Sequence, residues 1–198
     1  MQTNMDAEQA KLRNIIDLAF GFSAMTRVFE KGSTGKIVNQ LNEVLSQLSY
    51  LNNEREFADF HDGFCRWFVR NVKTAERTKR DGTKKPTGAA SYGQGAKVLD
   101  VVLKVCVYYC CFPDLDTAKR MAQWLNAGID TKMMGYLKGL PEGAGVNATS
   151  IEQVDKNTYI KLQVLVRKDI EASLPTGTLP VQLDDIKWRE LNKKNEVL

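Results

Sequence analysis

Apolar residues recur along most of this chain at intervals of three and four positions. The clearest series are Leu12, Ile15, Ile16 and Ala19, then Ile37, Leu41, Val44, Leu45 and Leu48, and then Phe57, Phe60, Phe64, Trp67 and Phe68. This spacing places the side chains on one face of an α-helix, whereas half-buried strands alternate every two residues. No clear two-residue alternation appears in the sequence, so the pattern predicts a helical protein.

The second half of the chain predicts further helices with recognisable ends. The expected segments are Asp116–Asn126 with Asp116 as N-cap, Asp130–Gly139 ended by Gly139 and Pro141, Asp155–Ala172 with Asp155 as N-cap, and Pro180–Lys193. Residues 31–35, 81–95 and 141–150 are rich in glycine, serine and threonine and predict loops. Together these segments predict an all-α fold of about seven or eight helices.

The apolar segment Lys97–Tyr109 differs from the others because its polar residues fall on one face. At about 100° per residue, Lys97, Asp100, Lys104 and Tyr108 form one stripe, and the remaining faces carry Val, Leu and Cys. Lysines are rarely fully buried unless they are paired or line a cavity, so two of them on a buried helix indicate a site. The alternative is that both ammonium groups reach solvent from a half-buried helix.

Length and composition indicate one compact unit over residues 1–198. Residues 1–88 hold mostly N-terminal helices and a basic loop, and residues 89–198 hold the helices of the candidate site. No apolar run approaches the roughly 20 residues of a membrane span, and the start Met1–Asp6 lacks the features of a signal peptide. We therefore expect a cytoplasmic monomer without a membrane partner.

Cysteine and histidine usage argues against a metal centre. The chain has four cysteines, Cys65, Cys106, Cys110 and Cys111, without a CxxC spacing, and a single histidine, His61. Structural zinc and iron–sulfur sites need three or four converging thiolate or imidazole ligands. We expect free thiols in the core, no metal and no cofactor.

The net charge of +4 is concentrated in one short segment. Between positions 73 and 85 six basic residues face two acidic ones, which already gives +4: the basic residues are Lys73, Arg77, Lys79, Arg80, Lys84 and Lys85. A flexible basic loop close to the candidate site helix is suited to attract a phosphate backbone. The alternative is an ordinary solvated charge run.

Three residues downstream of Lys97 complete a candidate pocket. Asp130 stands at the start of a predicted helix, where a carboxylate is also a common N-cap. Asp184 and Trp188 lie four positions apart and hence on one helical face. Trp188 is suited to stack on a flat heterocycle, although a tryptophan at helical spacing is more often a core residue.

Taken in order, these residues resemble a known family. The string Gly93-Gln-Gly-Ala-Lys97, a second lysine seven positions later, Ile129-Asp130, and Leu183-Asp184 followed by Trp188 are similar to the helix-hairpin-helix DNA glycosylases, and nearest to their archaeal 8-oxoguanine branch. The resemblance covers the chain from Ala89 to Trp188. The hairpin here reads Ala-Ser-Tyr-Gly-Gln-Gly where most of the family has Leu-Pro-Gly-(Val/Ile)-Gly, and Val101 stands where the archaeal branch carries an aromatic base-stacking residue.

The resemblance implies a fold, an activity and a set of roles. The fold would have two helical lobes around a cleft, with Lys97 as catalytic lysine and Asp130 as catalytic aspartate. Lys104, Asp184 and Trp188 would line the pocket for an excised base. DNA contacts would come from the hairpin and the basic loop, namely Tyr92, Gly93, Gly95, Lys79, Arg80, Lys84 and Lys85.

The expected function is therefore a DNA glycosylase that excises a damaged or modified base, with or without subsequent strand scission. The target base leaves the helical stack, and Trp188 or Trp67 offers an aromatic face to receive it. A role in a defence system or in a phage that modifies its bases is a further hypothesis. Two alternatives stay open: a non-catalytic DNA-binding protein of a mobile element, and a helical interaction protein in which Lys97 and Lys104 are only structural.

Overall fold

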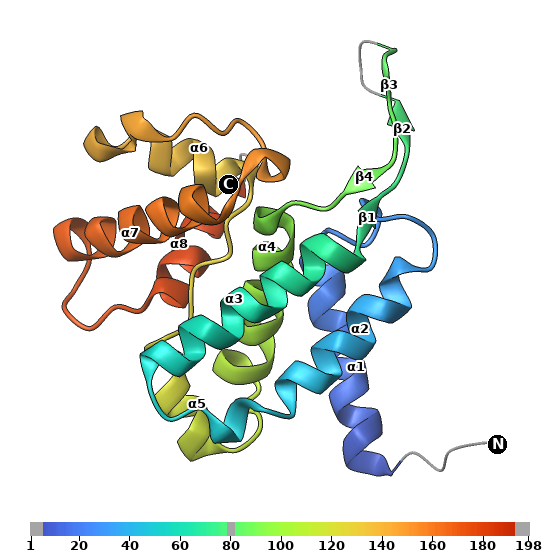
Figure 1. The fold of residues 1–198 in the computed structure, drawn as a ribbon. Coiled ribbons are helices and arrows are strands. Elements are labelled where there is room, and N and C mark those ends of the chain that lie inside the picture. Colours follow the sequence, from blue (N-terminus) through green and yellow to red (C-terminus); the bar gives the residue numbers. More distant parts are fainter. Residues whose placement is uncertain (1–5, 79–81, 193–198) are drawn as a thin grey trace, which may run out of the picture.

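The computed structural model describes residues 6–78 and 82–192, and the prediction of a mostly helical chain is confirmed (Figure 1). The α-helices are α1 (Ala7–Phe22), α2 (Ser33–Leu45), α3 (Glu54–Asn71), α4 (Tyr92–Leu103), α5 (Leu115–Ala122), α6 (Thr131–Lys138), α7 (Lys156–Ser173) and α8 (Pro180–Asn192). A π-helix, η2 (Lys104–Tyr109), continues α4, and short 3-10 turns lie at η1 (Leu48–Tyr50), η3 (Pro141–Gly145) and η4 (Ile151–Gln153).

Helix α4 lies in the middle of the fold. Helices α1 and α3 contact α4 from one side, and α7 contacts it from the other, where it packs with α6 and α8 (Figure 1). The buried apolar side chains form one core, to which all of these helices contribute. None of the helices within residues 6–78 and 82–192 is long and apolar enough to cross a membrane. The central position of α4 explains why its amino-acid sequence is apolar on most faces.

The basic segment is a β-ribbon, and the prediction of a flexible loop without strands is wrong. Strand β1 (Lys73–Thr74) pairs antiparallel with β4 (Gly88–Ala89), and β2 (Arg77–Thr78) pairs with β3 (Lys84–Lys85). The ribbon projects from the helical body (Figure 1), and its base is extended by a bridge between Phe29 and Thr74. Strands of two residues are too short to show an alternating pattern, so no periodicity in the sequence marks them.

The predicted glycine-rich hairpin before Lys97 is also wrong, because α4 begins earlier than expected. Ser91 is the N-cap: its hydroxyl accepts a hydrogen bond from the backbone N–H of Gln94 at 3.1 Å, and the Gln94 side chain accepts one from the Ser91 N–H at 2.8 Å. A Cβ at Gly93 would lie 2.5 Å from the Cβ of Val154, and one at Gly95 would lie 2.9 Å from the Cβ of Phe68. The two glycines therefore allow close packing inside the fold, and they do not form an exposed turn.

Carboxylate caps fix several other helix starts. The N-caps predicted at Asp130 and Asp155 are confirmed, with accepted hydrogen bonds of 2.8 Å from the backbone N–H groups of Met133 and Thr158. The prediction for α5 is wrong by two residues, because Asp114 is its N-cap and Asp116 lies in the first turn. Both carboxylates suit that end of a helix, and the sequence did not distinguish them.

Candidate active site

One cavity of about 640 Å³ collects all five residues that were predicted as catalytic or base-binding. Lys97 and Lys104 come from α4 and its π-helical continuation, Asp130 from the start of α6, and Asp184 and Trp188 from α8. These residues belong to three segments that are far apart in the sequence. The structure therefore brings the five predicted residues into one cavity. Spacing within a helix could not predict this, because it relates only residues of the same helix.

Of the two lysines that line this cavity, Lys97 is the one without a partner among the described residues. It is half-buried, and within the described part of the chain its amine takes part in no ion pair or hydrogen bond. Burial lowers the pKa of Lys97, and the nearby carboxylates of Asp130 and Asp184 only partly oppose this effect. A lysine with a lowered pKa has a larger fraction of neutral amine near neutral pH, which is the form that acts as a nucleophile.

Lys104 is in the opposite situation. Its ammonium group donates to Asp184 at 2.6 Å and to Asp185 at 3.0 Å, and the Tyr109 hydroxyl also donates to Asp185. Burial would lower the pKa of Lys104, but the two carboxylates outweigh it and raise the pKa. Burial raises the pKa of Asp184 although the Lys104 ammonium opposes this effect. Lys104 is therefore held as a cation, and only Lys97 is suited to lose its proton.

Asp130 is both a helix cap and part of the cavity wall. As the N-cap of α6 it accepts the hydrogen bond from Met133, and it also lines the cavity that holds Lys97. No ion pair joins the Asp130 and Lys97 side chains, although the carboxylate acts on the Lys97 pKa through space. Asp130 stands at the start of α6, where a carboxylate is a favourable neighbour of the helix dipole.

The predicted polar stripe on the helix is only partly correct. Lys97 and Lys104 face the cavity, but Asp100 and Tyr108 do not line it. Asp100 lies three positions after Lys97, about 60° around the helix, and this difference turns it away from the cavity and toward His61 and Tyr159. The π-helix η2 widens the last turn, so that Tyr109, five positions after Lys104, takes the place predicted for Tyr108.

Three exposed aromatic side chains border the cavity. Phe22, Tyr109 and Trp188 line it and keep 75%, 52% and 59% of their surface exposed. The core alternative for Trp188 is therefore wrong. Trp67 does not line the cavity: it packs against Phe64 and Phe68. A rim of exposed aromatic faces around a charged cavity is suited to a flat, polar ligand.

The predicted backbone grip of the hairpin does not exist in this structure. Tyr92, Gly93 and Gly95 are buried in the first turn of α4. The Gly93 N–H donates to the carbonyl of Val154 at 2.9 Å, and the Tyr92 hydroxyl donates to Asp62 at 3.2 Å. The groups that would hold a phosphate are thus already engaged inside the protein.

The predicted basic residues of the ribbon are partly paired. Lys85 and Arg77 both bind the carboxylate of Glu152, and Lys84 lies 4.0 Å from Glu76. Arg77 belongs to the same basic segment but was not among the expected DNA contacts. Lys79 and Arg80 lie outside the described residues. The ribbon is thus a charged projection whose outer strands are tied to the body by ion pairs.

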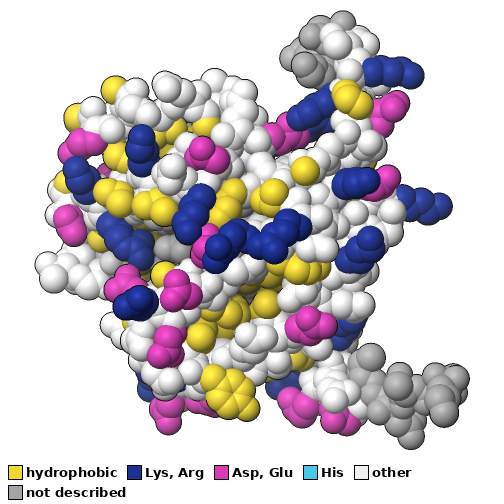
Figure 2. Space-filling view, in the orientation of Figure 1, with side chains coloured by type: hydrophobic (Ala, Val, Ile, Leu, Met, Phe, Trp, Pro, Cys, Tyr) yellow, Lys and Arg dark blue, Asp and Glu magenta, His cyan; other side chains and the backbone are white. Residues whose placement is uncertain are grey.

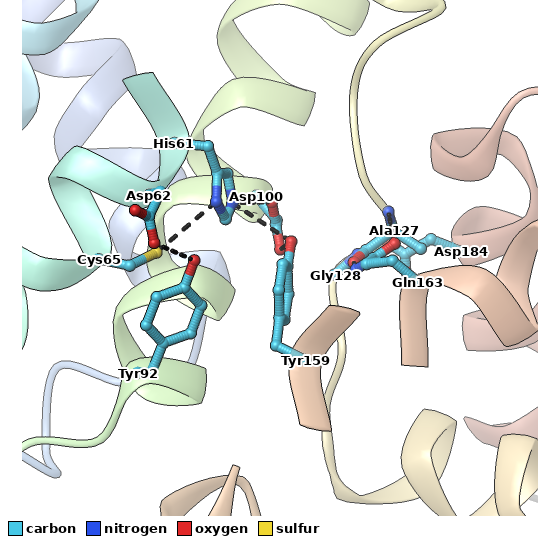
Figure 3. A network of polar contacts seen from close by, with 10 residues as sticks. All are labelled: His61, Asp62, Cys65, Tyr92, Asp100, Ala127, Gly128, Tyr159, Gln163 and Asp184. Carbon is cyan, nitrogen blue, oxygen red and sulfur yellow. Dashed lines mark hydrogen bonds and ion pairs between the residues drawn. The ribbon is translucent and has the colours of Figure 1, made fainter. Parts of the chain in front are cut away.

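A buried polar cluster on the other side of α4 was missed by sequence reasoning (Figure 3). His61 Nε2 lies 2.9 Å from a carboxylate oxygen of Asp100, and the Tyr159 hydroxyl donates to the other oxygen at 2.8 Å. The His61 ring stacks on Tyr159, and its Nδ1 lies 3.7 Å from the sulfur of Cys65. The cluster joins α3, α4 and α7 and so fixes the helix that carries Lys97.

The charge state of His61 follows from this environment. Burial would lower the pKa of His61, but its interactions with Cys65 and Asp100 outweigh burial and raise the pKa to about 10. Near neutral pH His61 is therefore held as the imidazolium. The sequence signal for the cluster was a histidine, His61, and an aspartate, Asp100, inside two apolar helical segments. Asp100 lies 39 positions and Tyr159 lies 98 positions from His61 along the chain, so their contact could not be read from local spacing.

The cysteines are all free thiols, as predicted, but only two lie in the core. Cys65 and Cys106 are buried, whereas Cys110 and Cys111 are exposed beyond the π-helix. Within residues 6–78 and 82–192 no group of three or more histidine, cysteine, aspartate or glutamate side chains is arranged to hold a metal ion. The cavity at Lys97 thus offers ammonium, carboxylate and aromatic groups.

Comparisons with protein-family models, with curated proteins and with solved structures find no match to this chain. The function of the chain is therefore inferred from the geometry of the cavity and from the resemblance of a few residues.

Proposed function

We propose that the chain is a DNA glycosylase-like enzyme that excises a damaged or modified base through Lys97. The observation that carries this proposal is the unequal state of two lysines in one cavity. Lys104 is held as a cation by two carboxylates, whereas Lys97 has a lowered pKa, no partner and Asp130 nearby. A nucleophilic amine beside a free carboxylate is what cleavage of an N-glycosidic bond through a covalent intermediate requires.

In the proposed reaction the neutral amine of Lys97 attacks the anomeric carbon of the sugar. The bond between that carbon and the base breaks, and the base leaves with the bonding electrons and takes up a proton. Opening of the sugar ring then gives a Schiff base between Lys97 and the former anomeric carbon. Water hydrolyses this Schiff base to an abasic site, or β-elimination of the 3′ phosphate precedes hydrolysis and cuts the strand.

Asp130 is proposed to stabilise the positive charge that develops on the sugar. The transition state has oxocarbenium character, and a fixed carboxylate in a partly buried cavity lowers its energy more than it would in water. Because Asp130 is held by its capping hydrogen bond, little reorganisation is needed during the reaction. Direct pairing with the Lys97 ammonium would favour the wrong protonation state, and no such pair is present.

The rest of the cavity is proposed to receive the extruded base. Trp188 and Tyr109 offer exposed aromatic faces, and stacking on such faces helps to offset the few kcal/mol that unstacking a base costs. Asp184 and Lys104 supply an acceptor and a donor at the cavity wall. We place the two helical lobes of the resemblance on the two sides of α4, with the basic ribbon as a contact for the DNA backbone.

The proposal is tested by incubating the protein with a panel of duplex and single-stranded DNAs that carry damaged or hypermodified bases, followed by heating in alkali. Wild-type protein should give alkali-sensitive abasic sites on at least one substrate, and Lys97→Gln should not. Lys161→Gln is the matched control, because Lys161 is exposed on α7 away from the cavity. DNA binding without excision on every substrate would favour a non-catalytic DNA-binding protein, and the absence of both would favour a helical interaction protein.

A further inference from the structure

A hollow between the outer strands of the ribbon, β2 and β3, and the turn η4 is separate from the Lys97 cavity. Its volume is about 470 Å³, and Arg77, Lys84, Lys85, Ser150, Glu152 and Gln153 are among the residues that line it. Three of these side chains are cationic and one is anionic, so the hollow keeps a surplus of positive charge. Figure 2 shows basic and acidic side chains next to each other on this projection.

The single carboxylate in the hollow is shared by two cations from different strands. Arg77 of β2 approaches one oxygen of Glu152 to 2.6 Å, and Lys85 of β3 binds the other oxygen. The Glu152 side chain is only 15% exposed, whereas Arg77 and Lys85 are 50% and 37% exposed. The cations can therefore be reached from solvent while the carboxylate lies behind them.

The turn that carries Glu152 is anchored to the helical body. Glu152 belongs to the turn η4, which is tied to the start of α4 by two hydrogen bonds. The Ser91 hydroxyl donates to the Ile151 carbonyl at 2.9 Å, and the Gly93 N–H donates to the Val154 carbonyl at 2.9 Å. These bonds hold η4, and with it Glu152, in place against the helical body.

We propose that Arg77, Lys84 and Lys85 form a binding site for one phosphate of a DNA backbone, and that Glu152 occupies this site in the free protein. A phosphodiester and a carboxylate both carry a single negative charge on two oxygens, and arginine and lysine bind either group. Lys84, which is 77% exposed, is the third cation and is only loosely paired with Glu76 at 4.0 Å. On binding, the phosphate replaces the Glu152 carboxylate.

Replacement of the Glu152 carboxylate by a DNA phosphate is favourable because only the phosphate releases a counterion. Arg77 and Lys85 are half-exposed, and ion pairs with a solvent-exposed partner contribute little to stability, so the pairs of Glu152 are weak competitors. A backbone phosphate releases a condensed counterion when it is neutralised, which the carboxylate does not. Glu152 therefore lowers DNA affinity without abolishing it, and it keeps the ribbon ordered in the absence of DNA.

The inference rests on the DNA-binding part of the proposed function, and its test does not require excision. The experiment measures fluorescence anisotropy of a labelled, undamaged DNA duplex between 50 and 200 mM salt. It compares wild type with Glu152→Gln and with Glu142→Gln, a control that also removes one negative charge but lies on η3 beside Lys168. Thermal denaturation of each variant checks that it is folded.

Glu152→Gln should bind DNA about threefold to tenfold more tightly than both wild type and the control, because the Glu152 carboxylate no longer competes with the phosphate for Arg77 and Lys85. Its salt dependence should be steeper by roughly one unit of slope. The double variant Arg77→Gln with Glu152→Gln should lose most of this gain. Affinity of Glu152→Gln equal to or below that of the control would mean that Glu152 only anchors the ribbon, and would overturn the inference.

Failure of this inference is distinguishable from failure of the proposed activity. Tighter DNA binding by Glu152→Gln together with no excision on any substrate would support the phosphate site and refute the glycosylase proposal. Excision by wild type together with unchanged DNA binding by Glu152→Gln would support the glycosylase proposal and refute the phosphate site. If neither wild type nor Glu152→Gln binds DNA, both proposals are wrong.

Discussion

Replacing Asp130 by Asn separates the capping role of this residue from its proposed catalytic role. Asn caps a helix about as well as Asp, so the accepted hydrogen bond from Met133 should persist and the free energy of unfolding should change by less than ~0.5 kcal/mol. The negative charge in the cavity, however, is lost. Removing one fixed group that stabilises transition-state charge typically slows a reaction by about 10²- to 10³-fold. At 1.36 kcal/mol per tenfold this loss corresponds to roughly 3–4 kcal/mol.

The same substitution has a second consequence for Lys97. Asp130 raises the pKa of Lys97 against the effect of burial, so removing its charge should lower that pKa further. The amine is the reactive form, and its fraction grows as the pKa falls. The alkaline rise of the excision rate should therefore shift to lower pH in Asp130→Asn, although the maximal rate falls. A purely structural change would lower the rate without moving this limb of the profile.

The assay is single-turnover excision over a pH series, with stability measured by urea denaturation. Asp155→Asn is the matched control, because Asp155 caps α7 through a hydrogen bond of the same length and does not line the cavity. The control should keep both its stability and its excision rate. If Asp130→Asn excises at the wild-type rate, Asp130 is a helix cap only and the assignment of the active site is wrong.

Four further measurements test other parts of the structure. Because the pKa of His61 is raised to about 10 in the folded protein, protonated His61 should stabilise the fold fully below about pH 6.5. As the pH rises toward 10, the free energy of unfolding from urea denaturation should fall by on the order of a few kcal/mol, and a free energy that stays constant over this range would contradict the raised pKa. Asp184→Asn should destabilise the protein by roughly 2–3 kcal/mol, since Lys104 keeps only Asp185 in a largely buried position, and a change below ~0.5 kcal/mol would argue against the pair. Trp188→Ala should lower kcat/KM by about 5- to 150-fold through lost stacking, with little change in melting temperature because the ring is mostly exposed; equal excision by the variant would remove Trp188 from the base pocket. Lys84→Ala should reduce the salt slope of DNA binding by about one unit, and an unchanged slope would show that this lysine contacts no phosphate.

The helices were predictable because their signals are local. Each apolar series and each carboxylate cap lies within a few residues of the structure it specifies, so α3, α6 and α7 appear close to where the sequence placed them. The start of α5 was misplaced because two aspartates, at positions 114 and 116, meet the same requirement. The ribbon was missed because its strands have two residues each and depend on pairing across the chain.

The candidate cavity was predicted by the resemblance more than by spacing. Spacing along the helix correctly paired Lys97 with Lys104, but it also included Asp100 and Tyr108, which face elsewhere. One error comes from a 60° difference around α4, and the other from a π-helical turn that no apolar period reveals. The His61 cluster depends on contacts between three helices, and its polar residues are ordinary within each helix taken alone.

Covalent trapping tests the central role of Lys97 most directly. The protein is incubated with a DNA substrate that it cleaves, in the presence of borohydride, which reduces a Schiff base to a stable amine. Peptide mapping of the resulting protein–DNA adduct should locate the DNA on Lys97. Lys97→Gln should give no adduct, whereas Lys104→Gln should still give one, because Lys104 is held as a cation by its carboxylates. An adduct that persists in Lys97→Gln, or that maps to another lysine, would contradict the account.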